Sequence, residues 1–310
     1  MMSTVSKKSS EDTVMMCCCA SCGIAEVDGI KLKDCDGGCD LVKYCSDDCQ
    51  NDHRDQHEEE CKKRLRDNDL LTRPGSSCYG DCPICCLPQS IDVRKSGVMP
   101  CCSKRICNGC DIANKKREVA EGLDQRCIFC REPVTKSEEE ADERLMESIK
   151  RNDPNAMYQM GTKRLEEGDY ETAFKYLSKA AGLGDAEAHC NLSELYYKGE
   201  GVVKDVEKAV YHWEEAAIAG HPRARYNLGC IEYNNRMYDR ARRHWIIAAN
   251  LGYHDSLSYI KKLYAKGHAS KEDYASALRA YQAALDATKS ADREKADKAI
   301  KSGEIRCIPM

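Results

Sequence analysis

The chain has 310 residues, enough for about two domains, and its 48 basic residues are slightly outnumbered by 52 acidic ones, for a formal net charge of −4. This balance argues against non-specific electrostatic binding to nucleic acid, so proteins are the expected partners. Nineteen of its 22 cysteines precede residue 131. That part of the sequence has few large apolar residues, and we expect metal ions to replace a hydrophobic core there.

The start of the sequence, Met1 to Val14, is polar and lacks the apolar stretch of about 7–15 residues that a secretory leader needs. No window approaches a transmembrane helix. We therefore expect an intracellular protein without a membrane span, in the cytoplasm or the nucleus. In such a reducing compartment, close cysteine pairs are metal ligands rather than disulfides. Residues 1–16 are polar and aperiodic, which predicts a disordered leader.

A first cysteine tract occupies residues 17–66. Zn²⁺ takes four sulfur or nitrogen ligands in a closed tetrahedral site, and a close pair of ligands can reach one ion from a single turn. The tract offers four such pairs and therefore predicts two zinc ions. The pairs are Cys19 and Cys22, Cys35 and Cys39, Cys45 and Cys49, and His57 and Cys61. Cys18 adjoins Cys19 and remains an alternative ligand.

This tract resembles the MYND finger, in its Tyr44-Cys45-Ser46 step and its His-x₃-Cys ending. One spacing is longer than usual, and the Gly37-Gly38 step allows the wider turn. The resemblance implies a module that binds short, often proline-containing peptides of partner proteins. It also implies interleaved sites, with zinc 1 held by Cys19, Cys22, Cys45 and Cys49, and zinc 2 by Cys35, Cys39, His57 and Cys61.

The choice of His57 over His53 follows from helix geometry. The segment from Ser46 to Arg66 has no glycine or proline and predicts a helix. Four residues, the spacing from His57 to Cys61, rise about 6 Å on a helix, whereas the eight from His53 rise about 12 Å. One zinc ion spans only the shorter spacing. We therefore expect His53 to lie beside the site or in solvent.

Residues 67–77 contain Pro74-Gly75-Ser76 and are expected to form a linker.

A second cysteine tract, residues 78–135, again holds four close pairs and predicts two more zinc ions, for four in all. Its long gaps suit an interleaved arrangement. Zinc 3 would take Cys82, Cys85, Cys107 and Cys110, and zinc 4 Cys101, Cys102, Cys127 and Cys130. Cys86, beside Cys85, remains an alternative.

The second tract resembles an all-cysteine variant of the RING finger, with Ile84, Arg131 and Pro133 where many RING ubiquitin ligases keep these residue types. The resemblance implies that Ile84 packs against a ubiquitin-conjugating enzyme, and that Arg131 contacts both that enzyme and ubiquitin. Two features depart from the family. Cys101 and Cys102 are adjacent, and Ile128 stands where a proline often follows the seventh ligand.

Residues 136–152 predict a connecting helix, and residues 153–289 repeat themselves. Alanine and aromatic positions recur, and Gly184, Gly220 and Gly252 give periods of 36 and 32 residues. Such periods are typical of stacked helical hairpins. The four units resemble Sel-one-like repeats, relatives of the tetratricopeptide repeat. Their recurring aromatic residues are expected in the core, and residues 290–310 are expected to form a polar capping tail. These aromatic residues are Tyr176, Trp213, Trp245 and Tyr281.

The sequence thus predicts a mainly α protein with two small cross-brace zinc fingers followed by an α-solenoid of helical hairpin repeats. Every zinc ion can be given four protein ligands, so we expect structural rather than catalytic metal. Two functions remain open. The protein is a RING-type ubiquitin ligase whose repeats and MYND-type finger recruit the substrate, or it is a non-catalytic adaptor with structural zinc fingers.

Overall fold

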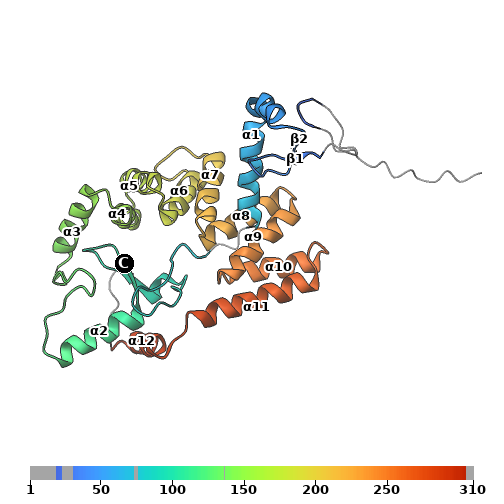
Figure 1. The fold of residues 1–310 in the computed structure, drawn as a ribbon. Coiled ribbons are helices and arrows are strands. Elements are labelled where there is room, and N and C mark those ends of the chain that lie inside the picture. The colour runs from blue at the N-terminus through green and yellow to red at the C-terminus, as the bar shows by residue number, and fades with distance from the viewer. Residues whose placement is uncertain (1–18, 23–30, 73–75, 136, 305–310) are drawn as a thin grey trace, which may run out of the picture. The chain divides into compact units, whose positions relative to one another are not determined.

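The computed structural model describes residues 19–22, 31–72, 76–135 and 137–304 (Figure 1). The expected leader, residues 1–16, lies outside these ranges, as do Cys17, Cys18 and Cys307. The described residues form twelve α-helices and two short antiparallel sheets, which confirms the mainly α fold. They divide into two compact units, residues 1–69 and 70–310. None of the described helices is long and apolar enough to cross a membrane.

The first unit is small and rich in cysteine. Strand β1 (Lys33–Asp34) pairs with β2 (Lys43–Tyr44), with Lys33 opposite Tyr44, and helix α1 (Asp47–Thr72) follows. Its buried cluster contains only two residues that are not cysteine, Leu32 and Tyr44; the others are Cys19, Cys35, Cys39 and Cys61. So little apolar surface cannot offset the conformational entropy lost on folding, which fits a fold that depends on metal.

Helix α1 is longer than the sequence predicts. It continues to Thr72, six residues into the segment expected as a linker. The physical reason is Leu70, which is 2% exposed and packs in the second unit against a core that contains Trp213. Burial of this leucine stabilises the last turn of the helix, whereas Pro74 and Gly75 lie beyond its end.

The second unit begins with the other cysteine tract. A single 3₁₀ turn, Val93–Lys95, leads into strand β3 (Ser96–Val98), which pairs with β4 (Arg105–Cys107), and helix α2 (Asn108–Ala120) follows directly. The buried cluster of this tract again consists mainly of sulfur-containing residues: Met99 and Ile106 accompany Cys82, Cys107 and Cys127.

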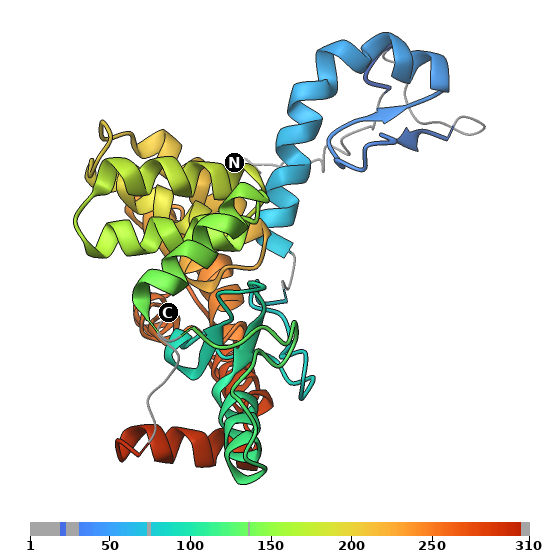
Figure 2. The same cartoon turned by 90° about the vertical axis from the view of Figure 1, so that its left-hand side faces the viewer.

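The rest of the second unit is helical. Helix α3 (Glu138–Lys150) is followed by four hairpins, in which each helix packs against the next in sequence (Figures 1 and 2). The hairpins are α4 (Pro154–Glu166) with α5 (Tyr170–Gly182), α6 (Ala186–Lys198) with α7 (Val206–Ile218), α8 (Pro222–Asn234) with α9 (Tyr238–Asn250), and α10 (Asp255–Ala265) with α11 (Lys271–Ala287). A last helix, α12 (Ala291–Lys301), packs against α2.

Aspartate side chains cap the first four helices of these hairpins. Asp153, Asp169, Asp185 and Asp205 each accept a hydrogen bond from a backbone N–H in the first turn of α4, α5, α6 and α7. Such caps satisfy the free N–H groups of a helix end. Trp213 and Trp245 are 4% and 0% exposed, and Tyr176 and Tyr281 are partly buried, so the recurring aromatic residues lie in the core as expected.

Close packing of α8 on α9 yields a first prediction. A Cβ atom on Gly229 would lie 2.5 Å from Nε1 of Trp245, which is itself fully buried, whereas a Cβ on Gly182 would meet nothing within 4 Å. We expect Gly229→Ala to destabilise the repeats by about 1–3 kcal/mol through overpacking. Denaturant unfolding followed by circular dichroism measures the effect. Gly182→Ala is the matched control, and equal midpoints for the two variants would contradict this packing.

Candidate metal centres

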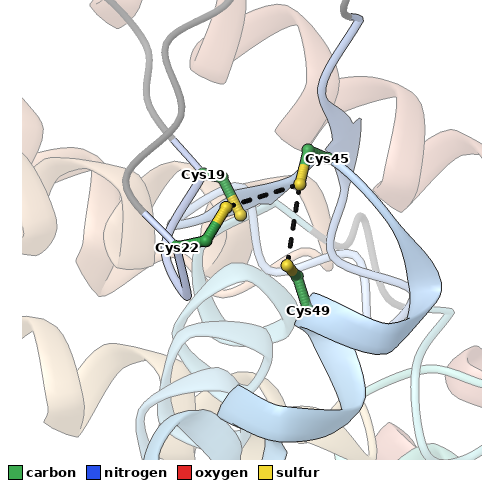
Figure 3. A group of neighbouring side chains, drawn as sticks. All are labelled: Cys19, Cys22, Cys45 and Cys49. Atoms are coloured by element: carbon green, nitrogen blue, oxygen red, sulfur yellow. Dashed lines mark hydrogen bonds between the residues drawn. The ribbon is translucent and has the colours of Figure 1, made fainter.

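The first group of four ligand atoms lies between β2 and the start of α1 (Figure 3). The sulfur atoms of Cys19, Cys22, Cys45 and Cys49 all lie within 4.8 Å of one another. The Sγ atoms of Cys22 and Cys45 are 3.5 Å apart, and those of Cys45 and Cys49 are 3.6 Å apart. Sulfurs on a tetrahedral zinc ion lie roughly 3.7 Å apart, given a bond of about 2.3 Å. The group therefore has the dimensions of a zinc site.

The second group is formed by Cys35, Cys39, His57 and Cys61, all four of them buried. Sγ of Cys35 is 3.8 Å from Sγ of Cys61, and Nε2 of His57 is 3.1 Å from Sγ of Cys39. The longer turn between the first two cysteines passes close to the site. A Cβ on Gly37 would lie 2.7 Å from the Cys61 sulfur, so this position has no room for a side chain.

His53 lies beside this group and not in it. Its Nδ1 is 3.0 Å from the hydroxyl of Tyr44, and its ring stacks on that of His57 with the centroids 5.9 Å apart. The helix rise that separated the two histidines in the sequence therefore places only His57 among the candidate ligands.

The third and fourth groups lie in the second tract. Cys82, Cys85, Cys107 and Cys110 form one, and Cys101, Cys102, Cys127 and Cys130 form the other. Sulfur separations of 3.9 Å between Cys85 and Cys107 and 3.7 Å between Cys102 and Cys127 again match tetrahedral zinc. The ligand pairs alternate between the two groups along the sequence, so the sites are interleaved. Cys78 and Cys86 lie outside all four groups.

Tight turns of the same type carry most of the candidate ligands in the second tract. The N–H of Cys86 donates to the carbonyl of Cys82 over 2.8 Å, and the N–H of Arg131 donates to that of Cys127 over 3.0 Å. Ser103 closes an equivalent turn onto Met99. Cys86, Ser103 and Arg131 each have a φ between 54° and 65°, a strained region for residues other than glycine. The adjacent Cys101 and Cys102 lie inside the turn from Met99 to Ser103, which lets both sulfurs belong to one group.

The residues expected to contact a conjugating enzyme lie at the surface of this tract. Ile84, within the first turn, is 44% exposed, and Arg131, at the end of the last turn, is also exposed. Neither side chain belongs to a group of candidate ligands. Their exposure leaves both available to a partner.

The second tract is joined to the repeats through a buried polar cluster that the sequence does not reveal. The N–H of Cys78 donates to the carbonyl of Gly220, a position where a Cβ would lie within 2.0 Å of the Ser76 carbonyl oxygen. Nearby, Nε2 of His221 is 3.5 Å from Oε2 of Glu187, which also accepts from the hydroxyl of Tyr158. In the sequence, the only feature that points to this contact is the glycine that recurs at the corresponding helix end of other repeats.

Charge is paired inside this cluster. Burial alone would raise the pKa of Glu187, but the neighbouring His221 outweighs it and lowers that pKa to about 2. Burial would likewise lower the pKa of His221, but the adjacent Cys190 and Glu187 raise it to about 10. Each group thus favours the charged form of the other. The N–H of Ala224 donates to Nδ1 of His221 over 3.2 Å, however, and this cap of α8 needs an unprotonated nitrogen, so it opposes the charged ring. By contrast, burial and two nearby arginines lower the pKa of His244 to about 3.

A cavity of about 1270 Å³ lies between the second tract and the first repeats. Met99, Pro100 and Ile128 line it from the tract, and Tyr158, Asn191 and Arg223 line it from the repeats. Both sides contribute apolar and polar side chains to the lining, and the space is large enough for a short peptide.

Comparison with known proteins identifies two classes of module in the protein. Residues 19–61 match the family model of the MYND finger. Residues 154–185, 186–221 and 222–253 match that of the Sel1 repeat, so three of the four helical hairpins are covered. The protein therefore contains a zinc-binding MYND finger and Sel1 repeats, both of which are protein-interaction modules.

Individual relatives each match part of the chain. The putative beta-lactamase HcpC of Helicobacter pylori is 39% identical over 56 residues, or 18% of this chain and 19% of the relative. A Sel1 repeat protein from Oxalobacter formigenes is 28% identical with a TM-score of 0.42, covering 54% of this chain and 66% of that protein. The antigen c5321 of uropathogenic Escherichia coli, with an SLR fold, is 21% identical with a TM-score of 0.39, covering 57% and 38%.

The buried ion pair yields a second prediction. Because the folded state raises the pKa of His221, this group stabilises the fold fully below its ordinary pKa near 6.5, and the stabilisation is lost as pH rises through about 10. Carbon-13 NMR of the histidine rings should find the pKa of His221 above 6.5 and that of His244 below it. Glu187→Gln should lower the pKa of His221 toward 6.5. A wild-type His221 that titrates near 6.5 would contradict the pairing.

Proposed function

We propose that the protein binds four structural zinc ions, one in each group of ligand atoms. Zinc 1 takes Cys19, Cys22, Cys45 and Cys49, and zinc 2 takes Cys35, Cys39, His57 and Cys61. Zinc 3 takes Cys82, Cys85, Cys107 and Cys110, and zinc 4 takes Cys101, Cys102, Cys127 and Cys130. The closed sets of sulfur and nitrogen ligands support this assignment, because zinc prefers them and no position is left for a reacting water. Because thiols stay reduced most readily in a reducing compartment, we place the protein in the cytoplasm or the nucleus.

We propose further that residues 78–135 form an all-cysteine RING-type finger and that the protein is a ubiquitin ligase. The observation that carries this proposal is the interleaving of the two cysteine groups, with Ile84 and Arg131 exposed beside them. Ile84 would pack against the conjugating enzyme. Arg131 would hydrogen-bond both that enzyme and ubiquitin, a double contact that the planar fork of an arginine can make. Such a ligase positions the thioester and supplies no nucleophile.

Substrate recruitment would fall to the MYND finger and the repeats. The cavity between the second tract and the repeats supports this division, because a peptide held there would lie beside the proposed ligase finger. Stacked helical repeats also present extended binding surfaces. Proteins, and not nucleic acid, are the proposed partners.

A non-catalytic adaptor is the second candidate function. Ile128 and the adjacent pair Cys101 and Cys102 favour it, because both depart from the pattern of RING ligases. Both modules that match family models act in protein interaction. In this case the second tract would only hold partners in place.

The number of metal ions provides a third prediction. Native mass spectrometry of the fully reduced protein should find four zinc ions per molecule. His57→Ala should lose at least one ion, because it removes a ligand, whereas His53→Ala, the matched control on the same helix, should retain four. Two or fewer ions in the wild type, or loss of zinc from His53→Ala only, would overturn the ligand assignment.

Ubiquitin discharge from a panel of charged conjugating enzymes tests the ligase proposal and provides a fourth prediction. Ile84→Ala should weaken binding of the conjugating enzyme. Arg131→Ala should leave binding nearly intact but slow discharge about tenfold or more, because it removes a positioning contact. Zinc content should be unchanged in both.

Arg94→Ala removes another exposed arginine of the same finger and serves as the control. It should discharge ubiquitin at the wild-type rate. If the wild type discharges no enzyme of the panel faster than a Cys82→Ser, Cys107→Ser variant, the adaptor function is favoured.

A further inference from the structure

The last described helix, α12, lies against the second cysteine tract, although about 170 residues separate them in the sequence (Figures 1 and 2). Ala296 and Ala299 are buried on one face of this helix. The two helices approach closely at Gly109, where a Cβ would lie 2.8 Å from the backbone nitrogen of Arg293. Nζ of Lys95 and a carboxylate oxygen of Asp297, 3.3 Å apart, add an ion pair across the same contact.

The guanidinium group of Arg293 reaches into the turn that carries two of the proposed zinc 3 ligands. Its Nη2 donates to the Sγ of Cys85 over 3.3 Å and to the carbonyl of Leu87 over 3.1 Å. Its Nη1 donates to the carbonyl of Pro88 over 2.7 Å and to that of Thr288, just before α12, over 2.8 Å. One side chain thus ties the start of α12 to three acceptors of the turn.

The contact places the positive charge of Arg293 beside the proposed zinc 3 site, whose own charge is negative. Four thiolates around one Zn²⁺ ion leave a net formal charge of about −2. A permanently charged guanidinium beside one of these sulfurs offsets part of this charge. Its N–H···S hydrogen bond also holds the sulfur in the orientation that the site needs. Groups that hydrogen-bond metal ligands typically change metal affinity by about 10–100-fold.

We propose that Arg293 is a positioning residue for the zinc 3 site, so that helix α12 completes the second finger. The inference rests on the proposed assignment of Cys82, Cys85, Cys107 and Cys110 to one zinc ion. It adds a residue outside the finger to the groups that hold that ion. The second finger then reaches its full zinc affinity only when helix α12, which follows the repeats, is present.

Zinc release from the full-length, reduced protein tests this inference. Transfer of zinc to a colour-forming chelator gives the rates, and timed cysteine alkylation with peptide mass spectrometry shows which group opens. In Arg293→Ala we expect the zinc 3 cysteines to lose zinc about 10–100-fold faster than in the wild type. The other three groups should keep their wild-type rates. Arg293→Lys keeps the charge but cannot reach all the acceptors, so its rate should fall between the two.

Lys295→Ala is the matched control, since this side chain on the same helix is exposed and pairs with Asp292 over 3.7 Å. It should release zinc at the wild-type rate. Equal rates for Arg293→Ala and the wild type would overturn the inference, as would equal acceleration at all four groups, which would mean general unfolding. If the wild type holds no zinc at the third group, the zinc assignment itself fails. If it holds zinc and Arg293→Ala changes nothing, only this inference fails.

Discussion

The meeting of close ligand pairs in groups of four is the constraint on which the described parts of the two cysteine tracts depend. Each short turn offers two ligand atoms, and a closed zinc site needs four, so two turns far apart in the sequence must meet at one ion. In both tracts the pairs alternate between two groups. With zinc bound as proposed, this arrangement would crosslink segments whose buried residues are mostly cysteine and whose apolar burial is small.

The second tract is also held by the repeats and by helix α12. It is tied at its start by the hydrogen bond from Cys78 to Gly220, near the contact of Glu187 with His221. It is tied at the other side by Arg293 on α12. The repeats and α12 therefore form a frame for the second tract. A ligase finger that must present Ile84 and Arg131 in a fixed direction would benefit from such a frame.

Local sequence patterns predicted much of this structure. The cysteine spacing predicted the four groups, and the rise of a helix predicted that His57, not His53, would join one of them. Both predictions depend on residues that are close in sequence. Repeat periodicity likewise predicted the hairpins and the burial of Trp213 and Trp245. The extension of α1 was missed, because a single leucine, Leu70, carries no sign of the distant core that buries it.

Contacts between distant segments were equally hidden. A glycine such as Gly109 has the same appearance in the sequence whether it serves a turn or the close approach of another helix. Arg293 belongs to a charged segment that was expected to form only a polar cap, and its partners in the turn lie more than two hundred positions earlier. Pairing of Glu187 with His221 depends in the same way on the stacking of two repeats.

X-ray absorption at the zinc edge tests the central claim most directly, because it reports the atoms bound to the metal in the reduced, full-length protein. The account predicts sulfur at about 2.3 Å as nearly the whole first shell, with one nitrogen shared among four ions and no oxygen. This ratio follows from three groups of four cysteines and one of three cysteines with His57. An average of about three sulfurs or fewer per zinc, or a distinct oxygen contribution, would contradict it.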